Sequence, residues 1–148
     1  MKALIQRVSS AHVEIAGKTV SGIKQGLLVF LCAVRGDTEK DLEYVVKKVP
    51  ALRIFEDEQK KMNRSVTDIN GEVLVVSQFT LAASTRKGNR PSFENAESPE
   101  KAMQMCDLFV NRLRDMGIPV QTGTFAAMMQ VFLVNDGPVT ISLDSRED

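Results

Sequence analysis

The chain opens with short stretches in which apolar and polar residues alternate, and these lead into a continuous apolar run. The alternation over residues 3–8, 12–15 and 19–23 predicts strands with one buried face. Residues 27–34, with the sequence LLVFLCAV, are apolar at every position, which is typical of a strand buried on both faces. Residues 73–76, VLVV, predict a second strand of this kind.

Two later segments have the periodicity of amphipathic helices. The first can be capped by Asp37-Thr38 and runs to about Val49, where Pro50 helps to end it. The second starts at Ser98-Pro99-Glu100 and stops at Gly117. Further strands are predicted over residues 52–55, 129–134 and 139–143, with a charged loop or hairpin over residues 56–63. Because strands outnumber helices, we expect a single α/β domain over residues 1–148, with a compact, β-rich mixed sheet or partly closed barrel and two main covering helices.

Composition narrows the class of protein without identifying it. The chain has 148 residues, of which 43% are hydrophobic and 26% charged, as in ordinary globular domains. Its formal net charge is zero, so any contact with RNA must depend on a local patch. Cys32 and Cys106 lack a C-x-x-C spacing and are expected to be buried, reduced thiols. No apolar run is long enough to span a membrane and the first residues do not form a signal peptide, so a cytoplasmic location is expected.

The sequence lacks the residues of several common catalytic mechanisms. His12 is the only histidine and lies in an alternating segment, which makes a Ser-His-Asp or Cys-His triad improbable. No cluster of His, Cys and carboxylates has the spacing of a metal site, and neither glycine-rich phosphate motif occurs. An enzyme with this sequence has to use hydroxyls, amides and backbone N–H groups.

Two polar segments could supply such groups. Ser77-Gln78-Phe79-Thr80 follows the strand at residues 73–76, where strand alternation would put Gln78 and Thr80 on one face and free N–H groups could polarise a carbonyl. Asn135-Asp136-Gly137-Pro138 joins the two last predicted strands, and its carbonyl oxygens could meet a ligand. On pattern alone, the first segment could equally be a plain strand end and the second a plain turn.

Two further groups of residues have both a structural and a functional interpretation. Arg86, Lys87 and Arg90 form a basic cluster, which is either a solvated loop or a phosphate contact. Phe125, Met128 and Met129 either pack in the core or form the wall of a pocket.

Taken together, these motifs resemble those of D-aminoacyl-tRNA deacylases of the bacterial and eukaryotic type. The resemblance runs through nearly the whole chain and is strongest in residues 75–82, 90–93 and 133–140. It implies hydrolysis of the ester between a D-amino acid and the 3′ adenosine of tRNA, with possible removal of glycine as well. It also implies a homodimer and neither a metal nor an organic cofactor.

The resemblance further assigns roles to individual residues. It implies that a cis Gly137-Pro138 step enters the partner subunit's site, binds the substrate's α-amino group and excludes L-amino acids by steric clash. Ser77, Gln78, Phe79 and Thr80 would form the catalytic segment. Phe125, Ala127 and Met129 would bind the substrate, and Arg86, Lys87 and Arg90 would contact tRNA. Thr80 has no histidine base, so we favour assistance from the terminal 2′-OH of the tRNA over nucleophilic attack by Thr80.

Two other functions remain as alternatives. A related deacylase removes L-alanine from the wrong tRNA, but it has a trans Gly-Pro step and a changed first motif. The intact Ser77-Gln78-Phe79-Thr80 argues against it. A non-catalytic RNA-binding module would use the basic cluster. Zero net charge and an aromatic content of 5% argue against this module, because a broad basic face and stacking platforms are not expected.

Overall fold

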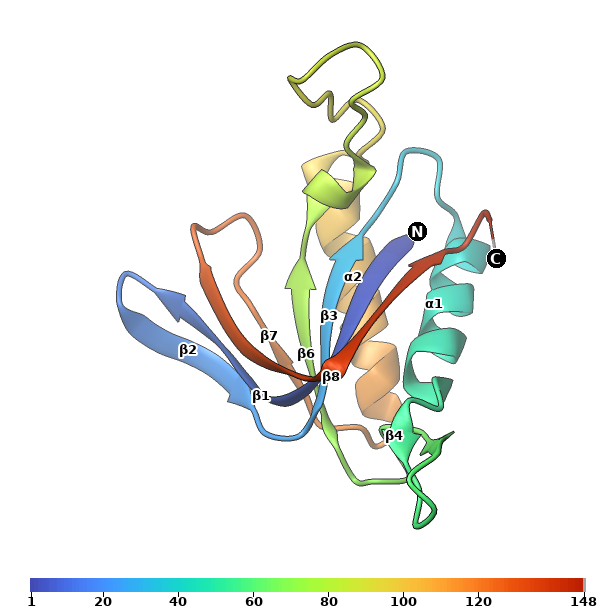
Figure 1. Ribbon diagram of the computed structural model, residues 1–148. Helices are drawn as coiled ribbons and strands as arrows, with labels where there is room; N and C mark the ends of the chain where they lie inside the picture. The colour runs from blue at the N-terminus through green and yellow to red at the C-terminus, as the bar shows by residue number, and fades with distance from the viewer. Residues whose placement is uncertain (148) are drawn as a thin grey trace.

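A mixed sheet with two helices on one face dominates the computed structural model, which describes residues 1–147 (Figure 1). Within these residues, six strands form the sheet, namely β1 (Lys2–Ile15), β2 (Lys18–Ile23), β3 (Gly26–Cys32), β6 (Glu72–Ser77), β7 (Val120–Thr122) and β8 (Gln130–Asp144). The other elements are the helices α1 (Glu39–Ala51) and α2 (Pro99–Asp115), the hairpin of β4 (Phe55–Glu56) and β5 (Met62–Arg64), and the 3₁₀ turn η1 (Phe79–Ala82).

Strand β1 organises the sheet because it is long enough to pair with three strands. Its first half lies between β3 and the end of β8, and its second half lies between β2 and the start of β8. All of these pairs are antiparallel, whereas β3–β6 and β6–β7 are parallel. Figure 1 shows β2 and the adjoining parts of β1 and β8 curling away from the helices. The predicted mixed, partly closed sheet with two covering helices is therefore confirmed.

The core has a layer on each side of the sheet. One layer packs β1, β3 and β6 against α1 and α2 and includes Phe109 and Leu113 of α2, which are fully buried. The other lies inside the curl and contains Val13, Leu28 and Leu74. Strand β3 contributes to both layers, which is the physical reason for its continuous apolar sequence.

Several predicted element boundaries were wrong. Residues 3–8 and 12–15 belong to one strand, and the predicted strand at residues 52–55 is reduced to the two residues of β4. Helix α1 continues through Pro50 to Ala51, because a proline near the end of a helix removes only one hydrogen bond. The short strand β7 was not predicted. Of the two cysteines, Cys32 is buried but Cys106 is only half-buried, and both are free thiols.

Neither helix in the described part of the chain is long and apolar enough to cross a membrane.

Gly26 gives a direct test of the contact between β3 and β6. A Cβ atom at this position would lie 1.8 Å from the carbonyl oxygen of Glu72, so an alanine would force the two backbones apart. We expect Gly26→Ala to lower the free energy of unfolding by about 3 kcal/mol or more, as measured by urea denaturation. The control is Gly17→Ala, where nothing lies within 4 Å and only the positive φ of 75° opposes a side chain. That variant should lose about 1–2 kcal/mol. Equal losses in the two variants would contradict the close approach.

Candidate active site

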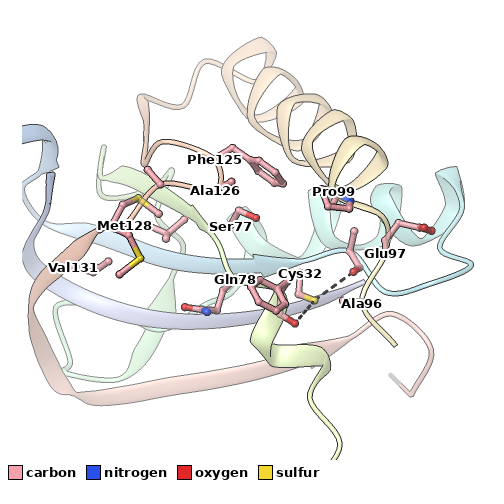
Figure 2. A pocket seen from close by; sticks show the side chains of 16 residues that line it. Cys32, Ser77, Gln78, Ala96, Glu97, Pro99, Phe125, Ala126, Met128 and Val131 are labelled. Atoms are coloured by element: carbon pink, nitrogen blue, oxygen red, sulfur yellow. Dashed lines mark hydrogen bonds between the residues drawn. The ribbon is translucent and has the colours of Figure 1, made fainter. Parts of the chain in front are cut away.

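A cavity of about 550 Å³ opens where the ends of β3 and β6 meet the start of α2 and the segment that precedes β8. Figure 2 shows Met128 and Val131 at one end, Glu97 and Pro99 at the other, and Ser77 and Phe125 between them. Six residues predicted to belong to the site line this cavity, namely Ser77, Gln78, Phe79, Phe125, Ala127 and Met129. The fold thus brings the two predicted halves of the site together from distant parts of the chain.

Strand β6 positions the first wall of the cavity. Ser77 is paired with Leu31 at the end of the parallel β3–β6 ladder, and the N–H of Gln78 donates to the carbonyl oxygen of Leu31 at 2.8 Å. The chain then turns into η1, so the strand alternation predicted for Gln78 and Thr80 was wrong. The two side chains nevertheless meet, because Nε2 of Gln78 donates to Oγ1 of Thr80. Thr80 itself is exposed and is not part of the cavity lining.

The start of η1 gives this wall its chemical character. The first N–H groups of a helical turn have no acceptor within the turn, and in η1 these belong to Phe79 and Thr80. The turn is short, but it begins at the cavity, which Phe79 lines. Donors in this position can polarise the carbonyl of an ester without any ionisable side chain.

Residues 125–129 form the opposite wall of the cavity. The N–H of Gly123 donates to the carbonyl oxygen of Val75 at 3.0 Å, which attaches this segment to β6. A Cβ atom on Gly123 would lie 2.7 Å from Sδ of Met129, so the glycine allows Met129 to lie close to the backbone. Phe125 and Met129 are half-buried, whereas Met128 is 92% exposed. These residues therefore form a pocket wall rather than the interior of the core.

Glu97 is a lining residue that the sequence analysis did not identify. Its carboxylate accepts hydrogen bonds from the N–H of Ser98 at 2.9 Å and from Nζ of Lys101 at 3.0 Å. The Ser98 N–H, followed by Lys101, lowers the pKa of Glu97 to about 2. The cavity wall therefore has a carboxylate that stays ionised above about pH 2. Its position just before the start of α2 was the only available signal.

Cys32 is a second lining residue that the sequence analysis did not assign to the site. Its thiol donates to the carbonyl oxygens of Ala33 and Phe79 at 3.4 and 3.6 Å, as the dashed lines in Figure 2 indicate. Burial, with a smaller contribution from the negative charge of Asp37, raises the pKa of Cys32 to about 11. A thiol with this pKa is protonated at neutral pH and is a poor nucleophile. Its hydrogen bond to Phe79 instead joins η1 to the end of β3.

The Gly137-Pro138 step lies elsewhere in the fold. Its peptide bond is cis, as the resemblance implied. Both residues are exposed, and neither lines the cavity. The ladder between β1 and β8 is regular up to Ser10–Val134, skips one residue of β1 before Val8–Asn135, and resumes at Gln6–Thr140. Four residues of β8 therefore bulge out opposite Arg7. This segment is therefore a bulge within one long strand and not a turn between two strands.

Arg7 and Asn135 hold this bulge, and the sequence analysis gave neither of them that role. Arg7 is only 6% exposed; its Nε donates to the carbonyl oxygen of Asp136 at 2.8 Å and its Nη1 to that of Ile54 at 2.6 Å. The amide of Asn135 donates to the carbonyl oxygens of Arg7 and Val139, each at 3.0 Å. The Asp136 carboxylate, with Oδ2 3.4 Å from Nε of Arg7, also lies beside the guanidinium. A lone arginine in an alternating strand gives no signal of this role, because all of its partners lie far away in the sequence.

The basic cluster lies on a hairpin that projects beyond the sheet. Reciprocal hydrogen bonds between Ser84 and Ser92, at 2.8 and 2.9 Å, close the base of this hairpin. Arg86, Lys87 and Arg90 are exposed and form no ion pair with other residues in the range 1–147. The olive loop at the top of Figure 1 contains this segment. These three cations are thus available to a bound anion.

His12 does not belong to the cavity. Its ring stacks on Phe132 with centroids 4.6 Å apart, and its Nε2 lies 3.3 Å from Oε1 of Glu14. Across residues 1–147, no three His, Cys, Asp or Glu side chains are grouped so that they could hold a metal ion.

Comparisons with known proteins agree with the motifs. The model of the D-Tyr-tRNA(Tyr) deacylase family matches residues 4–144. A D-aminoacyl-tRNA deacylase of Persephonella marina is 58% identical over 146 residues, with 99% of each chain covered. The solved structure of a c-Myc DNA unwinding element binding protein is 44% identical, with a TM-score of 0.93 and coverage of 97% of this chain and 98% of that chain. A probable eukaryotic D-amino acid tRNA deacylase has the same fold, with 18% identity, a TM-score of 0.80 and the same coverage.

The fold and the cavity define a small α/β protein with a candidate site that has largely apolar walls and lies beside the first N–H groups of η1. The chain belongs to the D-Tyr-tRNA(Tyr) deacylase family. The resemblance seen in the sequence is therefore confirmed.

The two thiols allow a test of the environment at the cavity. Burial raises the pKa of Cys106, like that of Cys32, to about 11, whereas an ordinary thiol has a value of 9.0. We expect the native protein to react with a thiol reagent at pH 8 at least about a hundredfold more slowly than the denatured protein. The rate should rise as the pH approaches 11. Cys106→Ser isolates the signal of Cys32, and rapid labelling of that variant at pH 8 would contradict the assigned environment.

Proposed function

We propose that this chain hydrolyses the ester bond of D-aminoacyl-tRNA and releases the D-amino acid and tRNA. Membership of the deacylase family supports this reaction class. The observation that supports the location of the site is the cavity itself, because it brings residues 77–79 and residues 125–129 to face each other. This is the arrangement that the family resemblance requires.

In the proposed reaction, the backbone polarises the substrate. The terminal adenosine lies against Phe125, Ala127 and Met129, and the ester carbonyl accepts a hydrogen bond from the N–H of Phe79, the residue of η1 that lines the cavity. Such a donor contributes about 3–4 kcal/mol to transition-state stabilisation. Ser77 and Gln78 hold this segment in place. Water attacks the ester carbonyl with assistance from the 2′-OH of the terminal ribose, and the 3′ oxygen of the ribose leaves with a proton as the D-amino acid is released. Thr80 is not the nucleophile, since neither His12 nor the protonated Cys32 supplies it with a base.

Chiral selection is assigned to Gly137-Pro138 of a second subunit. Within one chain, this step lies opposite Arg7 of β1, which in turn pairs with the residues around Leu27, at positions 26–28 of β3. Ser77, at the cavity, pairs with Leu31 of the same strand. The difference of three to five residues corresponds to about 10–17 Å along the strands. A substrate in the cavity therefore meets this step only if a partner supplies it. The carbonyl oxygens of the partner then bind the α-amino group, and an L side chain collides with their backbone.

The exposed surface next to this step supports a homodimer. Phe132 and Val134 are 43% and 57% exposed on β8, a few residues before Gly137. Exposed apolar residues beside a polar loop are typical of a protein–protein contact. A symmetric dimer would place the Gly137-Pro138 step of each subunit at the cavity of the other.

Three further properties belong to this proposal. Arg86, Lys87 and Arg90 contact tRNA phosphates, which positions the substrate without reading its sequence. Glycine has no side chain to collide with the partner's backbone, so glycyl-tRNA is expected to be cleaved as well. The cytoplasm, where translation supplies aminoacyl-tRNA, is the proposed location.

The central test compares the two enantiomers of one substrate. We expect purified protein with a chelator present to cleave D-tyrosyl-tRNA at least about a hundredfold faster than L-tyrosyl-tRNA, as for a clash of roughly 3 kcal/mol. The measurement is release of labelled tyrosine. Equal cleavage of both esters would contradict the chiral wedge. Survival of both would contradict the activity, and cleavage of L-alanyl-tRNA would then favour the related L-specific deacylase. Tight tRNA binding without cleavage would favour the binding module.

The role of Thr80 is tested separately. If the tRNA hydroxyl assists catalysis, Thr80→Ala removes only the hydrogen bond with Gln78. We expect kcat on D-tyrosyl-tRNA to fall by less than about tenfold, the effect of one ordinary hydrogen bond. Thr80→Ser is the matched control because it keeps the hydroxyl. Complete loss of activity in the alanine variant, with full activity in the serine variant, would instead make Thr80 the nucleophile.

A further inference from the structure

Two exposed phenylalanines lie together at the rim of the cavity. Phe79 lines the cavity and is 55% exposed, and Phe93 is 39% exposed. Their rings meet edge to face, with centroids 5.1 Å apart and an interplanar angle of 73°. This arrangement leaves part of each ring open to solvent. The low aromatic content of the sequence had predicted no such platform.

Phe93 also adjoins the basic hairpin. It follows Ser92, whose backbone closes the base of the hairpin against Ser84. Arg86, Lys87 and Arg90, which form no ion pair within residues 1–147, lie on the hairpin beyond this base. The order along the surface is therefore an apolar cavity, then two aromatic rings, then positive charge.

We propose that Phe93 stacks on the base of the nucleotide that precedes the terminal adenosine of the bound tRNA. This inference rests on the proposed function, because it takes the terminal adenosine to lie in the cavity. Counted inward from its 3′ terminus, a single-stranded RNA end presents the terminal nucleoside, then a second base, and then further phosphates. The surface has a matching series of a cavity, an exposed ring and cations. Single-stranded RNA is commonly bound by aromatic stacking together with cations that contact the phosphates.

Stacking suits a protein that acts on many tRNAs. Every base has a π-face, so an aromatic ring accepts any base without a hydrogen-bond pattern. Phe93 is a positioning residue in this scheme: it does not contact the ester, and it fixes the direction in which the strand leaves the cavity. Removal of such a stack typically weakens binding by about 5- to 150-fold.

The test uses three short substrates that differ only before the adenosine. These are the D-tyrosyl esters of adenosine, of cytidylyl-adenosine and of the same dinucleotide with an abasic first residue. For the wild-type protein, we expect kcat/KM on cytidylyl-adenosine to exceed the other two values by about 5- to 150-fold, mainly through KM. Phe93→Leu should lower kcat/KM on the cytidylyl-adenosine ester to the value for the abasic substrate. Its kcat/KM on the adenosine ester should stay within about twofold of the wild-type value. Phe93→Tyr should restore the difference.

Other outcomes would overturn the stacking. If Phe93→Leu slows cleavage of the adenosine ester and of the dinucleotide ester equally, Phe93 only supports the ring of Phe79. If kcat/KM of the wild-type protein is the same on the cytidylyl and abasic substrates, the base is not bound. Equilibrium binding of the two unacylated dinucleotides separates this inference from the deacylase proposal. Base-dependent binding that is lost in Phe93→Leu, in a protein that cleaves none of the esters, would refute the proposed reaction and support the stack. Binding that does not depend on the base would refute the stack.

Discussion

The parallel pairing of β3 with β6 is the contact on which the rest of the site depends. Gly26 lets the two backbones approach at the start of the pair, and Leu31 and Ser77 meet at its end. From there, Gln78 is bound to the carbonyl of Leu31 and the chain turns into η1 at the cavity. Because both strands are buried on both faces, their register is tightly specified. The backbone donors of η1 therefore take their positions from the core.

This construction suits a site without an ionisable catalytic group. The cavity contains a thiol that stays protonated and a carboxylate that stays ionised across the range in which proteins normally work. Neither group changes its charge near neutral pH. In the proposed mechanism, the assisting hydroxyl comes from the substrate and the protein supplies fixed dipoles. Catalysis then depends on the geometry of the backbone, which the sheet maintains.

The bulge at Gly137-Pro138 shows a similar use of backbone atoms. Arg7 is buried beneath it and donates to two carbonyl oxygens, while Asn135 closes its base. A buried guanidinium requires such partners, since an unpaired buried charge is strongly destabilising. The exposed step is therefore held by a rigid strand, although it lies far from the cavity of its own chain. The proposed dimer gives this distant position a function.

The sequence by itself determined the layers of the fold and the residue types of the site. Apolar runs on two faces identified β3 and β6, helical periodicity identified α1 and α2, and the motifs identified the family. These features are local, so the order of residues records them directly. Only the tertiary structure decided that Ser77 faces Phe125 across the cavity and that Gly137 lies elsewhere. It also decided that Cys32 and Glu97 line the cavity and that Arg7 holds the bulge. Their contacts join residues far apart in the chain, often through backbone atoms, and such contacts leave no pattern in the sequence around each residue.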